Sequence, residues 1–134
     1  MSTIDVATIQ SQADETPPVF KDAAGSREIV QGAWAWAHFN GIGTLAVDDS
    51  FNVSSVTDNG TGDYTLNFAN SLPNANYAVG GSGTSDITLT AVGVWISPYI
   101  TKSVSALRIE TVIWSGTRVV IDSSDVSAVI FCNP

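Results

Sequence analysis

T-D-N-G-T-G-D-Y-T-L-N-F, residues 57–68, is the clearest β-hairpin signal in this chain of 134 residues. An Asn-Gly pair lies within it, and such a pair supplies the positive φ values that a tight reversal requires. Tyr64, Leu66 and Phe68 then occupy alternate positions, with polar residues between them. This period of two predicts a strand with one buried face, preceded by a tight turn.

The segments on either side of this hairpin also have strand patterns. Residues 33–39 alternate strictly, with Trp34, Trp36 and His38 on one face and alanines followed by Phe39 on the other. The alanine face would let a neighbouring sheet approach closely. Residues 126–132 carry apolar side chains on both faces, which is typical of a central strand.

These short strands, separated by Gly, Asn and Pro turns, predict an all-β domain, either an antiparallel β-sandwich or a small barrel. We find no helix signature of useful length and no internal repeat. Residues 48–50 are expected to form a turn, and the glycine-rich residues 80–83 a loop. The sandwich would span residues 33–134, after an extended N-terminal attachment segment, residues 1–32, which contains two consecutive prolines.

Composition argues against several classes of partner. Charged residues make up only 13% of the chain, and the formal net charge is −8, so nucleic acid would be repelled over most of the surface. No stretch approaches the roughly 20 apolar residues of a membrane helix, and the first residues do not read as a secretory signal, so we expect no membrane insertion. Cys132 is the only cysteine, which excludes an internal disulfide.

Candidate catalytic and metal-binding residues are few. His38 is the only histidine, and no G-x-S-x-G motif is present to supply a nucleophilic serine. Residues 58–63 could gather oxygen ligands around calcium, but they lack the full loop spacing and the distal glutamate, which favours a plain turn. One histidine and one distant cysteine cannot complete a zinc site. We therefore expect no catalysis, no metal and no cofactor.

Aromatic side chains and Ser- and Thr-rich loops are the better functional candidates, because exposed aromatic rings stack on sugars. The receptor-binding candidates are Trp95, Tyr99, Trp114, Ser82, Thr84 and Asp86. The subunit-interface candidates are Trp34, Trp36, His38, Arg108 and Glu110. Arg108 and Glu110 are expected to face water or another subunit, and for the tryptophans core packing is the alternative.

Four strings in the chain resemble a known module. They are F-N-G-x-G-T at residues 39–44, S-F-N-V-S-S at 50–55, T-D-N-G-T-G-D-Y-T at 57–65, and P-x-A-N-Y at 73–77. This series resembles a domain that recurs in the tail fibres and related structural proteins of tailed bacteriophages. The resemblance implies a virion appendage part, often trimeric and distal, with a role in host attachment or beside it. It implies no enzymatic chemistry.

Together these observations predict a non-enzymatic tail-fibre tip or similar virion protein, assembled in the host cytoplasm. It would bind a host-surface receptor, a glycan or a protein, as a homotrimer, and residues 1–32 would attach it to another virion protein. Few charges and the absence of a disulfide fit a domain stabilised by burying subunit surface. The alternatives are a monomeric carbohydrate-binding module, distinguished by its native mass, and a polysaccharide-degrading enzyme of the tailspike type.

Overall fold

The computed structural model describes residues 32–84, 102–114 and 116–133, and the backbone alone of residues 91–96. Nine strands account for most of these residues, and none of the described residues lies in a helix. The described part of the chain therefore contains no helix that could cross a membrane. The strands are β1 (Ala35–Asn40), β2 (Ala46–Phe51), β3 (Val53–Gly60), β4 (Asp63–Phe68), β5 (Ala78–Thr84), β6 (Ala91–Ile96), β7 (Ala106–Trp114), β8 (Arg118–Val120) and β9 (Asp125–Phe131).

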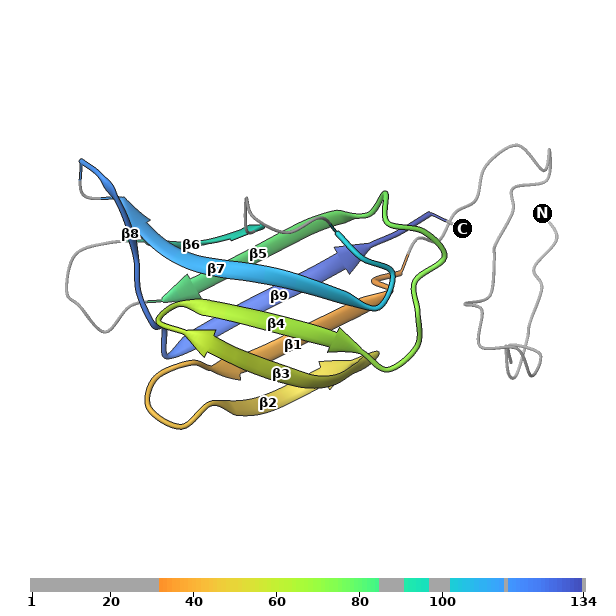
Figure 1. Ribbon diagram of the computed structural model, residues 1–134, viewed down its shortest axis with the longest axis horizontal. Helices are drawn as coiled ribbons and strands as arrows, with labels where there is room; N and C mark the ends of the chain where they lie inside the picture. The colour runs from red at the N-terminus through yellow and green to blue at the C-terminus, as the bar shows by residue number, and fades with distance from the viewer. Residues whose placement is uncertain (1–31, 85–90, 97–101, 115, 134) are drawn as a thin grey trace, which may run out of the picture. The chain divides into compact units, whose positions relative to one another are not determined.

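The strands form two four-stranded antiparallel sheets that pack face to face (Figure 1). The first has the order β2-β1-β9-β5 and is called here the β9 sheet. The second has the order β6-β7-β4-β3 and is called the β4 sheet, with the short β8 paired to β7. A short pairing of β5 with β6 joins the two sheets at one edge. The sandwich is therefore the architecture adopted, of the two that the sequence predicted.

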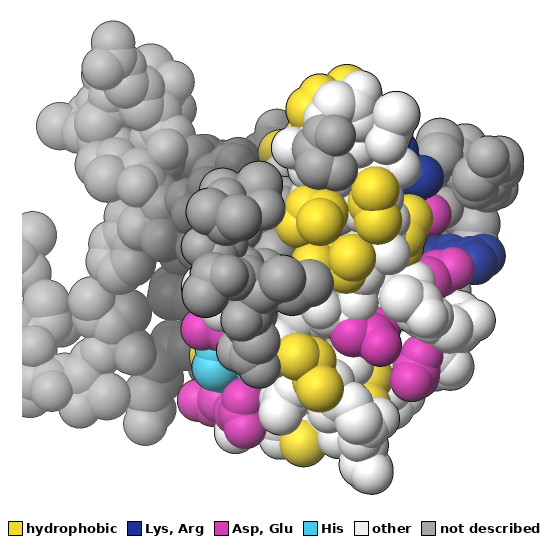
Figure 2. Space-filling model, turned by 90° about the vertical axis from the view of Figure 1, so that its left-hand side faces the viewer, with side chains coloured by type: hydrophobic (Ala, Val, Ile, Leu, Met, Phe, Trp, Pro, Cys, Tyr) yellow, Lys and Arg dark blue, Asp and Glu magenta, His cyan; other side chains and the backbone are white. Residues whose placement is uncertain are grey.

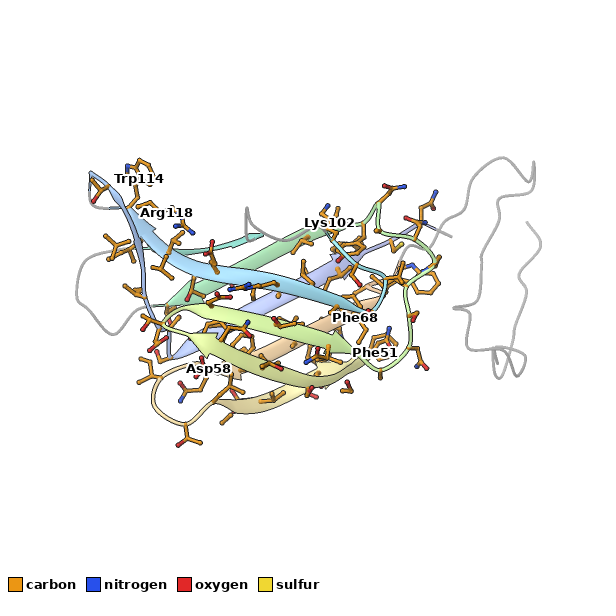
Figure 3. All side chains as sticks on the ribbon, in the orientation of Figure 1. Phe51, Asp58, Phe68, Lys102, Trp114 and Arg118 are labelled. Atoms are coloured by element: carbon orange, nitrogen blue, oxygen red, sulfur yellow. The ribbon has the colours of Figure 1, made fainter. Side chains whose placement is uncertain are left out.

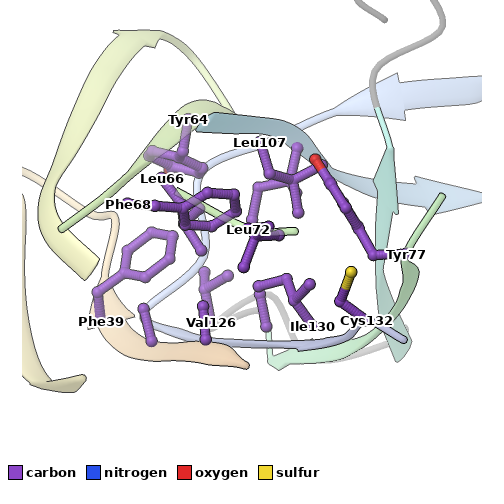
Figure 4. Packing of buried hydrophobic residues seen from close by; sticks show 14 residues of the cluster. Phe39, Tyr64, Leu66, Phe68, Leu72, Tyr77, Leu107, Val126, Ile130 and Cys132 are labelled. Atoms are coloured by element: carbon purple, nitrogen blue, oxygen red, sulfur yellow. The ribbon is translucent and has the colours of Figure 1, made fainter. Parts of the chain in front are cut away.

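Alternating side chains from the two sheets make the core (Figure 4). Tyr64, Leu66 and Phe68 of β4 are buried, as the pattern of the hairpin predicted. The rings of Phe39 and Tyr64 meet edge to face, with centroids 5.0 Å apart. Each large apolar side chain buried in this way contributes about 1.5–3 kcal/mol through removal from water. Ala35 and Ala37 of β1 are also buried in this core.

The predicted hairpin of residues 57–68 is present as β3 and β4, but its tightest point lies further along the chain than expected. Gly60 pairs with Asp63, so Thr61 and Gly62 make the turn. Gly60 and Gly62 supply the positive φ angles, 129° and 61°, rather than the Asn-Gly pair as a unit. The side chain of Asn59 instead donates a hydrogen bond of 2.8 Å to the hydroxyl of Thr65.

Two expectations about local structure are wrong. Residues 48–50 belong to strand β2, and a bulge between His38 and Phe39 accommodates the extra residue in this pairing. The charged side chains are tolerated because β2 is a solvent-exposed edge strand. Residues 80–83 are not a loop but part of β5, which pairs with β9 along seven residues. This extended pairing outweighs the weak strand propensity of glycine.

Strand β9 is central, as predicted, because it pairs with both β1 and β5. Only one of its faces is covered by the β4 sheet, however. Val126 and Ile130 are fully buried on the inner face, whereas Val129 is half-buried and Phe131 is 41% exposed on the outer face. The outer side of an apolar strand is thus left at the surface.

Three connections between strands meet at Asp122, in a cluster called here the Asp122 junction. The carboxylate Oδ1 of Asp122 accepts a hydrogen bond of 2.6 Å from the amide of Gly62, and the hydroxyl of Tyr64 lies 3.1 Å from the same oxygen. That hydroxyl is also 3.2 Å from the carbonyl oxygen of Gly41. Burial raises the pKa of Tyr64, and the negative charge of Asp122 raises it further.

Asn52 holds the point where the chain passes from the β9 sheet to the β4 sheet. Its φ of 54° lies in the left-handed region, which asparagine tolerates better than most residues. Its side-chain amide donates to the carbonyl oxygens of Trp34 and Asn70, at 3.0 and 3.1 Å. Its side-chain oxygen accepts from the amide of Asn70 at 2.7 Å. One side chain therefore ties together three separate segments.

Candidate functional site

The outer face of the β9 sheet carries an apolar row across three strands. Trp36 of β1 lies opposite Phe51 of β2 on one side and Val129 of β9 on the other. Gly80 of β5 continues the row opposite Val129. Phe51 is 54% exposed, and Trp36 and Val129 are half-buried. Large apolar side chains thus line up at a surface where no described strand covers them.

A shallow depression lies on this face, called here the Trp36 groove. Its volume is about 530 Å³, within the range of small-ligand sites. The groove is open rather than enclosed, and Gly81 of β5 adds no side chain to its lining. The residues that line it are Trp36, Ala37, His38, Gly81, Ser82, Ser127, Ala128 and Val129. They come from β1, β9 and β5.

A polar row runs beside the apolar one, one step further along the strands. His38 lies opposite Ser127 of β9 and Asp49 of β2, and Ser127 lies opposite Ser82 of β5. Within the described part of the chain, neither serine hydroxyl takes part in a hydrogen bond. Two hydroxyl groups therefore face the groove with their hydrogen-bonding capacity available.

His38 lies between two carboxylates at the end of this polar row. Its Nδ1 is 3.3 Å from Asp48 Oδ2, and its Nε2 is 3.2 Å from Asp125 Oδ1. Figure 2 shows the cyan imidazole with magenta carboxylates above and below it. Both ring nitrogens face carboxylates, and neither is hydrogen-bonded to a hydroxyl of a described residue, as a Ser-His-Asp triad would require.

The receptor-binding candidates fall on different surfaces. Ser82 lines the Trp36 groove, and Thr84 lies further along β5, opposite Asp125 on the same face. Trp114 is 69% exposed near the β7–β8 hairpin of the other sheet, beside Arg118 (Figure 3). Only the backbone of Trp95 is described, in β6, whereas Tyr99 and Asp86 lie outside the described residues.

The subunit-interface candidates also divide between the two sheets. Trp36 and His38 lie on the outer face of the β9 sheet, where they meet Ser82, so candidates for two different roles share one groove. Trp34 precedes β1 and packs partly against the core, so it does not line the groove.

Arg108 and Glu110 are not free to face water in the way that was expected. Glu110 is only 7% exposed and is paired with Arg118 across the β7–β8 hairpin. Arg108 is half-buried and makes a two-pronged ion pair with Asp63, in which its Nε is 2.6 Å from Asp63 Oδ1. These hydrogen bonds hold the pKa of Asp63 below its ordinary value. Both charges on β7 are thus neutralised within the chain.

The acidic turn considered for calcium is occupied by structural contacts. Asp58 Oδ1 accepts a hydrogen bond of 2.9 Å from the amide of Gly60, and Asp63 binds Arg108. Across the residues with described side chains, no group of three or more His, Cys, Asp or Glu is arranged to hold a metal ion. Asp58 therefore stabilises the turn, and Asp63 stabilises the pairing of β4 with β7.

Sequence reasoning missed the Trp36 groove as a unit. Its residues come from three segments that are far apart in the chain and meet only through the pairing of β1, β9 and β5. The alternation in residues 33–39 did place Trp36 and His38 on one face. Nothing in the sequence indicated the register that brings Ser127 and Ser82 beside them.

No protein-family model matches the chain, and neither a curated protein nor a solved structure matches it.

Proposed function

We propose that this chain is a non-enzymatic module of a phage virion appendage, which binds a host-surface glycan as a homotrimer. The Trp36 groove carries this proposal, because it combines an aromatic side chain with two serine hydroxyls that make no hydrogen bond to any described residue. Such a combination suits the sugar ring, which has an apolar face and a polar rim. Residues 1–32 would attach the module to another virion protein.

The positions of the four phage-like strings support a scaffold of this kind. Gly41, Gly62 and Tyr64 of two strings meet at the Asp122 junction, and Asn52 of a third ties the two sheets together. Tyr77 of the fourth is buried, and its hydroxyl lies 3.1 Å from the carbonyl oxygen of Ser103. These residues of the four strings maintain the fold, whereas none of the residues that line the Trp36 groove belongs to a string.

A trimer would turn weak contacts of single grooves into useful avidity. The exposed Phe51 and Phe131 are the kind of side chain that a subunit contact would cover. A monomeric carbohydrate-binding module would use the same groove without that contact.

Native mass measured by light scattering after size exclusion tests the assembly. A stable species of three 14.0 kDa chains is expected. A monomer at all concentrations would contradict the trimer and favour the single carbohydrate-binding module. Binding of the labelled protein to intact cells of a bacterial panel, with heat-unfolded protein as the control, tests attachment. Absence of binding to every strain would contradict the receptor-binding role.

A further inference from the structure

We infer that the Trp36 groove selects uncharged sugars and rejects glycans that carry carboxylate, sulfate or phosphate groups. This inference rests on the proposed function, and it goes further by naming the chemical class of glycan that the groove accepts. It is carried by the arrangement of the two rows and by the distribution of charge over the molecule.

The two rows match the two kinds of surface on a pyranose ring. Neighbouring strands lie about 4.8 Å apart, so the apolar row and the polar row both extend over a length of several sugar atoms. Trp36 and Val129 offer an apolar bed for the ring face. Ser127 and Ser82 lie beside them and can donate to, or accept from, sugar hydroxyls. A ligand that extends along the strand direction would contact both rows.

Among the described residues, three carboxylates lie close to His38 at the edge of the groove. Asp48 and Asp125 flank His38, with side chains that are 54% and 50% exposed, and Asp49 lies opposite His38 on β2. Their carboxylate oxygens accept hydrogen bonds from hydroxyl groups, as uncharged sugars require. They would repel an anionic sugar in the same place.

The described cations are engaged elsewhere and cannot offset this repulsion. Arg108 and Arg118 form ion pairs on the other sheet, and the Nζ of Lys102 donates to the carbonyl oxygen of Tyr77. The formal net charge of −8 for the whole chain acts in the same direction. Rejection of anionic glycans therefore follows from both the local and the overall charge.

Affinity electrophoresis of the full chain tests the inference, with dextran, mannan and galactan as uncharged probes and alginate, polygalacturonate and hyaluronan as anionic ones. We expect retardation by at least one uncharged polysaccharide and by none of the anionic ones. Trp36→Ala should lower the affinity measured from the retardation by at least about tenfold, which corresponds to about 1.4 kcal/mol of binding free energy. Val119→Ala is the control, since it truncates an exposed apolar side chain on β8 of the other sheet, and should change affinity less than about twofold.

Ser82→Trp provides a second variant in case Trp36→Ala does not fold, because it fills the groove from an exposed strand position. It should abolish retardation as well. Retardation by an anionic probe at equal or greater affinity would overturn the inference, and so would unchanged binding by Trp36→Ala or Ser82→Trp, or no binding to any uncharged probe.

The oligomeric state separates failure of this inference from failure of the proposed function. If Trp36→Ala folds but is a monomer where the unchanged chain is a trimer, the groove is a subunit contact. This result would overturn the inference, whereas the proposal that the protein is a trimer would stand. If the chain binds intact cells but no uncharged polysaccharide, the inference again fails while the attachment role survives.

Discussion

Replacement of Gly62 by alanine should destabilise the sandwich severely, because this residue meets two separate constraints. Its φ of 61° lies in the left-handed region, which an L-residue enters at a cost of about 1–2 kcal/mol. A Cβ at this position would also lie 2.4 Å from the carbonyl oxygen of Ile121. Backbone cannot yield to such a contact as the end of a flexible side chain could.

The second constraint determines the size of the effect. Relief of the clash requires the hairpin turn to move away from residues 121–122, and this movement breaks the hydrogen bond from the Gly62 amide to Asp122. A hydrogen bond to a charged acceptor contributes about 1.5–3 kcal/mol. Together with the left-handed strain, the expected loss in the free energy of unfolding is roughly 2.5–5 kcal/mol. This is a large part of the 5–15 kcal/mol typical of whole proteins.

Gly43→Ala is a matched control for this substitution. Gly43 has a similar φ of 70°, but no described atom lies within 4 Å of the position that its Cβ would take. It should therefore lose only the conformational part, about 1–2 kcal/mol. Urea unfolding followed by tryptophan fluorescence, at one protein concentration for all variants, measures both losses. If Gly62→Ala loses no more stability than Gly43→Ala, close packing at the Asp122 junction is not what requires glycine.

Three further substitutions or titrations probe other contacts. The folded-state pKa of Asp63 lies below its unfolded value near 3.9, so the stability that Asp63 contributes is present above that pH and is lost as pH falls through the folded pKa. Urea titrations at a series of pH values should show this loss of stability. In Asp63→Asn the dependence of stability on pH in this range should be smaller. Burial raises the pKa values of Tyr64 and Tyr77 above the ordinary value of about 10. Tyrosinate absorbance at alkaline pH should therefore show that these two phenols ionise only when the protein unfolds. Ionisation of both phenols in the folded protein would refute their burial. Asn52→Ala should lower the free energy of unfolding by about 2 kcal/mol or more, because its hydrogen bonds are lost. Asn52→Asp keeps the acceptor for the Asn70 amide and should lose less stability. Equal losses in the two variants would contradict the assigned contacts.

The fold class could be read from the sequence because its signals are local. Alternation in residues 33–39 and 64–68 places their apolar side chains on one face whatever the partner strand is. The hairpin of residues 57–68 needs only its own turn residues. The prediction of a loop at the glycine-rich residues 80–83 was wrong because their strand is not specified locally. It forms through pairing with β9, a segment more than 40 residues away.

The candidate site could not be assembled from the sequence because it depends on register. A shift of one residue between β1 and β9 would turn Ser127 away from His38 and replace it with a core residue. No local pattern specifies that register. The pairing of Glu110 with Arg118 was missed for a similar reason, because it crosses the β7–β8 hairpin.

The structure separates positions that maintain the fold from positions that are free to differ. Gly62, Tyr64 and Asn52 each satisfy several contacts at once, so a replacement there loses several interactions together. Ser82 and Ser127 make no side-chain hydrogen bond within the described chain, and they project from strands whose pairing uses backbone atoms alone. A change at these two positions would alter the Trp36 groove at little cost to stability. The same sandwich could therefore present different binding surfaces, which is the property that a receptor-binding module requires.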